Sequence, residues 1–330
     1  MIGILPVVTS AALAGAAPEC TLGAADQAWL DRSMQAWNYA TRHISGIGRI
    51  KQIQAIIFDD RCVVVSDTAM NGGPNRWTGH LHGGTVVLPG DQKLKPQVIS
   101  FAQSGKPTSH FVMSTPSIWR AANKSGKGTS LENLMTAVIM HEATHVAQMP
   151  TYGAVIGKIA EQYHLPEDFS DDSIQEEFGK NAEFVASIDR ESALLMQASN
   201  SKSRAKAVRL VRSARALMRA RYARWFSSKD AYHAETEPIW LTLEGSGQWM
   251  AYRWLTDPKG ANAAPAKVKP GFISDHWWTQ REGFAAFMAL ERLTGIAWKE
   301  QAFHLGQKDV LQMLDEAANA GSARNPPHQT

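Results

Sequence analysis

The residues with the clearest chemical potential lie in the segment VIMHEATHVAQ, which covers residues 138–148. Two histidines, His141 and His145, stand four residues apart there, and Glu142 directly follows the first. On an α-helix, residues four apart share one face, so both imidazoles can bind one ion at about 2 Å. Glu142 is rotated by about 100° from His141 and can instead reach a water bound to that ion. The spacing therefore predicts a zinc site in which Glu142 takes a proton from water that attacks a carbonyl.

A catalytic zinc ion needs a third protein ligand and an open position. The chain has only two cysteines, so this ligand is expected to be a histidine or a carboxylate. The best candidate is Glu244 in IWLTLEGSGQWMAYRWL, residues 239–255. It stands among bulky apolar residues, where an uncompensated carboxylate is costly to bury, and the small residues from Gly245 to Gly247 permit close packing of its helix. Gln248, one turn further on, is placed to orient a ligand.

Three other glutamates remain open as the third ligand. Glu282 lies in HWWTQREGFAAFMALERL, and Glu183 and Glu191 lie in NAEFVASIDRESALLMQA. An arginine directly precedes both Glu282 and Glu191, so each has a simpler interpretation as a paired or solvated acid, and Glu191 is expected on an exposed helix face. Glu244 is therefore preferred, with the other three as alternatives.

The reaction also needs a donor to stabilise the negative oxygen that forms on the attacked carbonyl. Tyr252 lies eight residues after Glu244, two helical turns along the same face. It is the predicted stabiliser, and His233 and His276 are the alternatives.

The sequence HEATH followed by the distant segment WLTLEG resembles the gluzincin class of zinc metallopeptidases, to which thermolysin and the membrane alanyl aminopeptidases belong. Those aminopeptidases carry an HExxH helix and a third ligand in a segment of the form W-L-x-E-G-x-A. The resemblance implies one zinc ion per chain, held by His141, His145 and Glu244, with Glu142 as general base and a peptide or protein as substrate. It also implies an edge strand beside the active-site cleft, for which residues 110–115 in HFVMSTPSIWR are the candidate.

The helix that carries the histidines is predicted over residues 130–149. Thr129 and Glu132 have the spacing of a capping box directly before the apolar run, and Pro150 follows its end. A loop is expected further along, near residues 257–274.

The whole chain divides into four segments. Residues 1–16 are an apolar, signal-like leader, and residues 17–128 combine a helix with short β-rich runs separated by turns. Residues 129–320 are helical, and residues 321–330 are expected to be a disordered tail. The fold class is therefore α+β: a small, mostly antiparallel N-terminal sheet followed by a larger, all-helical, zincin-like part.

Composition limits the classes of function. A net charge of +3 argues against a nucleic-acid-binding polycation, and no apolar run is long enough to span a bilayer. The leader predicts a protein exported to the periplasm or the extracellular space. In such a compartment the two cysteines, Cys20 and Cys62, are expected to form a disulfide.

Residues 201–226 form a predicted helix with an apolar stripe and nine lysine or arginine residues. The pattern is typical of a surface helix with a solvated basic face, although it would also suit an anion or a cell-wall polymer. The sequence as a whole predicts an exported zinc metallopeptidase. The alternative is a non-catalytic exported protein that binds zinc, or a scaffold that binds cell wall or anions.

Overall fold

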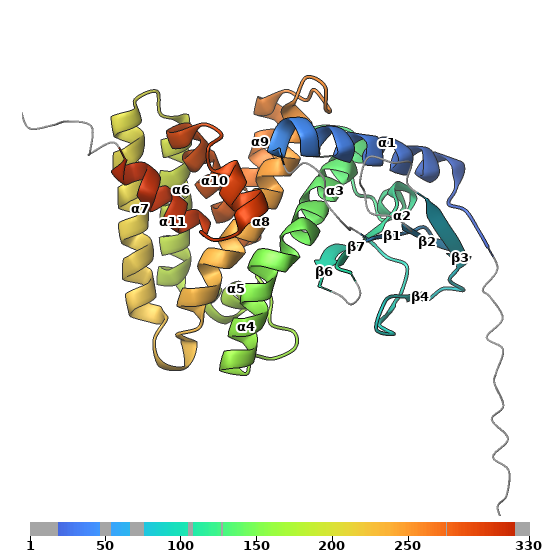
Figure 1. The fold of residues 1–330 in the computed structure, drawn as a ribbon, viewed down its shortest axis with the longest axis horizontal. Coiled ribbons are helices and arrows are strands. Elements are labelled where there is room, and N and C mark those ends of the chain that lie inside the picture. Colours follow the sequence, from blue (N-terminus) through green and yellow to red (C-terminus); the bar gives the residue numbers. More distant parts are fainter. Residues whose placement is uncertain are drawn as a thin grey trace, which may run out of the picture.

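The computed structural model describes residues 19–46, 54–66, 76–104, 108–126, 128–274 and 276–320. It confirms the α+β fold class, because a small, mostly antiparallel sheet lies on the N-terminal side and helices form the rest (Figure 1). Helix α3 (Leu131–Gln148), which carries the histidine pair, runs between these two parts. The predicted leader and tail, residues 1–16 and 321–330, lie outside the described residues.

Five strands form the main sheet in the order β3-β2-β1-β7-β6. Their bounds are β1 (Gln54–Phe58), β2 (Cys62–Ser66), β3 (Trp77–Leu81), β6 (Ser100–Gln103) and β7 (His110–Ser114). Neighbouring strands run antiparallel, except β1 and β7, which are parallel. A separate ribbon pairs β4 (Val86–Val87) with β5 (Lys93–Leu94).

The strand predicted to lie at the edge beside the cleft is in the interior of the sheet. Residues 110–114 form β7, which pairs with β1 on one side and with β6 on the other. Every residue of β7 is buried, as expected of a central strand whose two faces are both covered. The edge strand that packs against α3 is β6, which is only partly buried. The prediction for residues 110–115 is therefore wrong by one strand.

Helix α1 (Ala24–Ala40) packs against α3 (Figure 1). The indole Nε1 of Trp29 donates to the carbonyl oxygen of Glu132 at 3.2 Å, and the hydroxyls of Ser33 and Thr136 lie 2.8 Å apart. These contacts fix the N-terminal half of α3, the part of the helix that precedes the two histidines.

A disulfide joins Cys20 to Cys62, as predicted, and fastens the segment before α1 to β2. The backbone N–H of Cys20 also donates to the carbonyl oxygen of Gly79 in β3 at 3.1 Å. The two cysteines are 42 residues apart, and closing a loop of that size stabilises the fold by about 3–4 kcal/mol through the unfolded state.

The start and end of α3 differ from the prediction. Ser130, not Thr129, is the N-cap, and its side chain accepts a backbone N–H of the first turn at 3.1 Å. Pro150 does not end the helical path, because it lies in the first turn of a π-helical segment (Met149–Gly153) that leads into α4 (Ala154–Tyr163). The path changes from α- to π-helix at this proline, so the regular i→i−4 hydrogen-bond pattern is interrupted where its N–H is missing.

The remaining helices are α2 (Pro116–Ala121), α5 (Ser173–Phe178), α6 (Ala182–Asn200), α7 (Arg204–Trp225), α8 (His233–Thr256), α9 (Pro265–Ile273), α10 (Trp278–Thr294) and α11 (Val310–Asn319). α8 is central, because it packs against α3 on the sheet side and against α10 on the other. The loop predicted near 257–274 contains α9, which begins at a proline in its first turn.

α8 and α10 cross with their backbones in contact. A Cβ on Gly245 would lie 2.4 Å from the carbonyl carbon of Gly283, and a Cβ on Gly283 would lie 2.6 Å from the carbonyl oxygen of Leu241. The close packing predicted from the small residues after Glu244 is therefore confirmed. Any side chain larger than hydrogen at this crossing would force the two helices apart.

The basic helix predicted over 201–226 is α7, and part of its basic face holds α11. Arg215 forms an ion pair with Asp315 at 3.0 Å, and Arg212 donates to the carbonyl oxygen of Ala318 at 3.0 Å. That carbonyl is at the C-terminal end of α11, where the helix dipole favours a positive charge. Much of the positive charge on α7 is therefore used inside the fold.

Candidate metal centre

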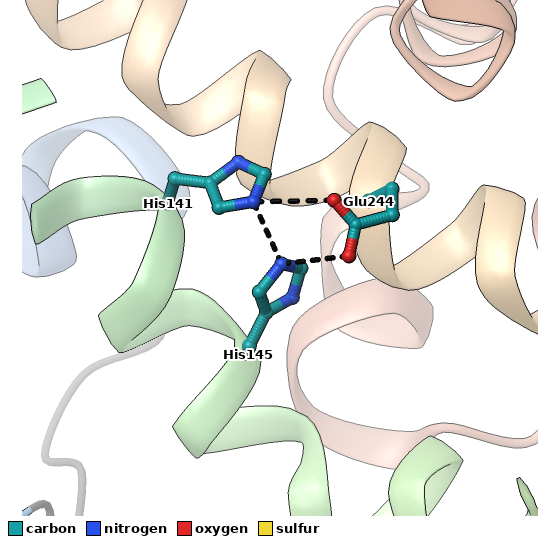
Figure 2. A group of neighbouring side chains, drawn as sticks. All are labelled: His141, His145 and Glu244. Carbon is teal, nitrogen blue, oxygen red and sulfur yellow. Dashed lines mark hydrogen bonds and ion pairs between the residues drawn. The ribbon is translucent and has the colours of Figure 1, made fainter. Parts of the chain in front are cut away.

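Three side chains from two helices converge on one point (Figure 2). His141 and His145 come from α3, and Glu244 comes from α8. The two histidine Nε2 atoms are 2.8 Å apart. The Glu244 carboxylate places Oε2 3.2 Å from Nε2 of His141 and Oε1 3.0 Å from Nε2 of His145. All three residues are buried, and their ligand atoms lie within 4.8 Å of one another, so this triad could hold a metal ion.

The electrostatics of the triad suit a divalent cation. Burial opposes ionisation of Glu244, but the charge of His145 and the hydrogen bonds from both imidazoles outweigh it and lower the pKa of Glu244 below its ordinary value. Among the described residues, buried Oε2 of Glu244 has no polar partner besides Nε2 of His141 at 3.2 Å, and Nδ1 of His145 is buried without a hydrogen bond. An ionised carboxylate and two converging imidazole nitrogens are donor atoms that zinc binds. The residues present therefore fit such an ion.

Small residues of α8 make room for the triad. A Cβ on Gly247 would lie 2.8 Å from Nδ1 of His141, so only glycine leaves the imidazole where it is. The neighbouring Ser246 accepts a hydrogen bond from Nε2 of Gln148 at 2.9 Å, and the same amide donates to the carbonyl oxygen of Ala302 at 2.8 Å. This buried contact fixes α3 against α8 one turn beyond the second histidine.

Glu142 lies outside the triad and lines an adjoining cleft. It is buried, and the side chain of Ser100 lies beside its carboxylate. Burial raises the pKa of Glu142 to about 7, although the charge of His141 opposes that shift. A carboxyl with a pKa near neutrality can both take up and release a proton, which is the property required of a general base that later acts as an acid.

The cleft beside the triad has a volume of about 550 Å³. His141 and Glu142 line it from α3, and Val98 and Ser100 line it from the β6 side. Apolar side chains of α3, α8 and α9 form part of its walls: Leu134, Ala137, Val138, Ala251, Leu255 and Val268. Polar side chains also line it: Lys124, Ser125, Gln248 and Gln280. A cleft that combines apolar walls with polar groups is the usual form of a small-ligand or substrate site.

The alternative ligands Glu191 and Glu282 lie in a second buried cluster, which surrounds Arg221 of α7. Nη2 of Arg221 is 2.8 Å from Glu191 and 3.8 Å from Glu282, and Nη1 is 2.9 Å from Glu237. The expectation that Glu191 is exposed is wrong, because the residue is fully buried. Glu183, the remaining alternative, is exposed and pairs with an arginine of α7. The structure therefore brings only Glu244 to the histidine pair.

Arg221 and Glu237 were not identified from the sequence. Arg221 lies three residues after Met218 and seven after Ala214, and both of these belong to the buried stripe of α7. Its position on that stripe was the available signal for a buried cation. A buried arginine requires buried acids as partners. A buried position for Arg221 therefore indicates that an acid such as Glu191 is its structural partner.

The residues considered as oxyanion stabilisers do not line the cleft. The ring of Tyr252 packs edge-on against Phe272 and Phe284, and its hydroxyl is not part of the cleft wall. His233 is buried and pairs with a glutamate of α5, and His276 lies against a glutamine of the same helix. Gln248 does line the cleft, but its amide bonds to another glutamine rather than to a triad residue.

No family model matches the chain, and no curated protein or solved structure matches it either. Within the part of the chain that the structure describes, no helix combines the length and the apolar character needed to cross a membrane. What the site can do therefore rests on its own residues.

Proposed function

We propose that the chain is a zinc-dependent hydrolase of gluzincin type, with one zinc ion per chain and a peptide or protein as substrate. The observation that carries the proposal is the convergence of His141, His145 and Glu244 beside the cleft that Glu142 lines. A structural zinc site fills its four positions with protein ligands and needs no base. This triad supplies three ligands and has a buried carboxylate next to it, as a catalytic site requires.

Zinc held by the triad would supply a water of lowered pKa and a Lewis acid for the carbonyl oxygen. The carboxylate of Glu142 takes the proton of the attacking water and passes it to the leaving nitrogen. The side chain of Ser100 lies beside that carboxylate and favours its ionised form. The apolar side chains of the cleft walls would displace water when a substrate binds, which would strengthen each electrostatic interaction in the site.

The position of β6 supports a peptide substrate. This edge strand packs against α3, and Ser100, its first residue, both lines the cleft and contacts Glu142. An exposed strand edge can pair with an extended peptide through main-chain hydrogen bonds. A peptide that adds to β6 would therefore pass the proposed general base.

The disulfide between Cys20 and Cys62 supports a periplasmic or extracellular location, since such bonds persist in oxidising compartments. The rival interpretation is a zinc-binding scaffold without turnover. Its anion-binding version has less support, because α7 uses much of its positive charge to hold α11.

Glu142→Gln separates an enzyme from a zinc-binding scaffold. The variant keeps every proposed ligand and loses the base, so we expect wild-type zinc content and a turnover of a peptide library reduced by about 10²–10⁴-fold. His145→Ala should lose both zinc and turnover. Elemental analysis of dialysed protein and mass spectrometry of the peptide library measure the two quantities.

Glu161→Gln is the matched control, because this exposed glutamate of α4 lies on another helix. It should change neither zinc content nor turnover. Wild-type protein that holds one zinc and cleaves no peptide would favour the scaffold. Equal zinc in wild type and in His145→Ala would place the metal elsewhere.

A further inference from the structure

Two glutamine side chains line the cleft on the wall formed by α8 and α10. Gln248 belongs to α8, four residues after Glu244 and therefore on the same helical face. Gln280 belongs to the first turn of α10. Nε2 of Gln248 donates to Oε1 of Gln280 at 2.7 Å, and both residues share the cleft with His141 and Glu142.

This hydrogen bond leaves the amino group of Gln280 available to the cleft. A glutamine amide has one acceptor oxygen and two N–H donors, and here the oxygen is occupied by Gln248. Among the residues that the structure describes, none accepts a hydrogen bond from Nε2 of Gln280. The bond also fixes the plane of the Gln280 amide, so its donors are oriented before any substrate binds.

The proposed hydrolysis needs such a donor. A negative charge develops on the carbonyl oxygen in the transition state, and a preorganised N–H in a water-excluded site stabilises it. Two other donors of the cleft face protein groups: the side chain of Ser100 lies beside Glu142, and Nε1 of Trp119 donates to Oγ of Ser114 at 2.9 Å. Ser125 is exposed. Lys124 is exposed at the cleft.

We propose that Gln280 is a catalytic residue whose Nε2 donates a hydrogen bond to the developing oxyanion, and that Gln248 is the positioning residue that holds its amide. This inference rests on the proposed hydrolase function and extends it. It replaces Tyr252 in the role of oxyanion stabiliser. No bond to Gln280 forms or breaks in the step, and the amide remains neutral throughout.

Gln280→Ala in the zinc-loaded full-length protein tests the proposal. We expect kcat to fall by about 10²–10³-fold, as for the loss of one oxyanion-hole donor, while KM stays within about threefold because the interaction forms in the transition state. A phosphinic peptide, which imitates the tetrahedral species, should lose affinity by a factor similar to the loss in kcat/KM. Zinc content and thermal midpoint should match those of wild type.

Gln248→Ala tests the positioning role. It should lower kcat less than Gln280→Ala does, and the double variant should be no slower than Gln280→Ala alone, because the two residues act as a unit. Gln162→Ala, on the exposed face of α4, is the matched control and should leave all values unchanged.

The outcomes separate the inference from the function on which it rests. A kcat for Gln280→Ala within about threefold of wild type, with normal zinc content, overturns the role of Gln280 and leaves the hydrolase intact. An unchanged affinity of Gln280→Ala for the phosphinic peptide also overturns the role of Gln280 and leaves the hydrolase intact. Wild-type protein that neither cleaves peptides nor binds the phosphinic peptide overturns both.

Discussion

Two buried polar clusters share helix α8 and compensate charge in opposite ways. Glu244 belongs to the histidine triad, and Glu237, seven residues earlier on the same face, belongs to the Arg221 cluster. In the Arg221 cluster a guanidinium already lies among the carboxylates. In the triad, the carboxylate faces two imidazoles, and no lysine or arginine of the described residues pairs with it. The first cluster carries its own cation, and the second is suited to one from solution.

The Arg221 cluster contains more acid than base. Glu191, Glu237 and Glu282 surround a single guanidinium, so full ionisation would leave net negative charge in the interior. Burial, followed by the charge of Glu191, raises the pKa of Glu282 well above its ordinary value. A bound proton therefore helps the arginine to balance this cluster. Of the two clusters, the one that could hold a metal ion is therefore the one whose glutamate is neutralised by neither an arginine nor a proton.

Removing the internal cation should have the largest effect on stability. Arg221→Met leaves three buried glutamates without their positive partner, and breaking a buried ion pair from one side costs about 3–5 kcal/mol. We expect a fall of that size in the free energy of unfolding of metal-free protein, measured by urea denaturation. His145→Ala, in contrast, should change the metal-free value less, because the imidazole of His141 remains beside the Glu244 carboxylate.

Arg219→Met is the control for that prediction. Arg219 is on the same helix, but its side chain is 59% exposed, and it lies 3.8 Å from Asp315, so its loss should change stability by less than about 0.5 kcal/mol. If Arg221→Met does not fold, adding Glu191→Gln and Glu237→Gln should restore folding. Equal stability of wild type and Arg221→Met would contradict the structural role of the cluster.

Gly247→Ala should affect the triad alone. Its Cβ would lie 2.8 Å from Nδ1 of His141, so the imidazole must move from the position in which it faces Glu244. We expect zinc affinity to fall by about 10–100-fold, or about 1.4–2.7 kcal/mol, measured by competition with a chelator. Gly157→Ala, where no atom lies within 4 Å of the added Cβ, should leave the affinity unchanged. Unaltered affinity in Gly247→Ala would mean that His141 is not a ligand.

The triad could be predicted from the sequence because its signals are local. His141 and His145 owe their common face to a spacing of four within one helix, and Glu244 was recognisable because its neighbours are bulky and apolar. The disulfide was also predictable, since the chain offers a single pair of cysteines. The fold class was predictable as well, because the sequence pattern changes from β-rich to helical near residue 129.

The errors concern contacts between distant segments. Glu191 was expected in solvent because its neighbours in sequence are polar, yet its partner Arg221 is 30 residues away on another helix. The strand predicted to lie at the edge is the neighbour of the edge strand, because strand order depends on pairing between strands, which the local sequence pattern does not encode. Gln280 lies in the cleft only because α10 crosses α8 at two glycines, Gly245 and Gly283.

The smallest expected effect concerns the proton in the Arg221 cluster. Glu282 has a folded-state pKa above its ordinary value of 4.5, so its contribution to stability is fully present below that value and is lost as pH rises through the folded pKa. One such group lowers the free energy of unfolding by at most about 1.4 kcal/mol per pH unit within that window.

Glu282→Gln tests this contribution, because it imitates the protonated acid. Between acid and neutral pH, the free energy of unfolding of this variant should fall less than that of wild type. Glu142, whose pKa is also raised, adds the same slope to both proteins, so the difference between them reports the proton that the Arg221 cluster binds. Glu183→Gln, which changes an exposed acid, should keep the wild-type slope in urea denaturation of metal-free protein. Parallel curves for wild type and Glu282→Gln would show that the cluster holds no proton and that the arginine alone compensates it.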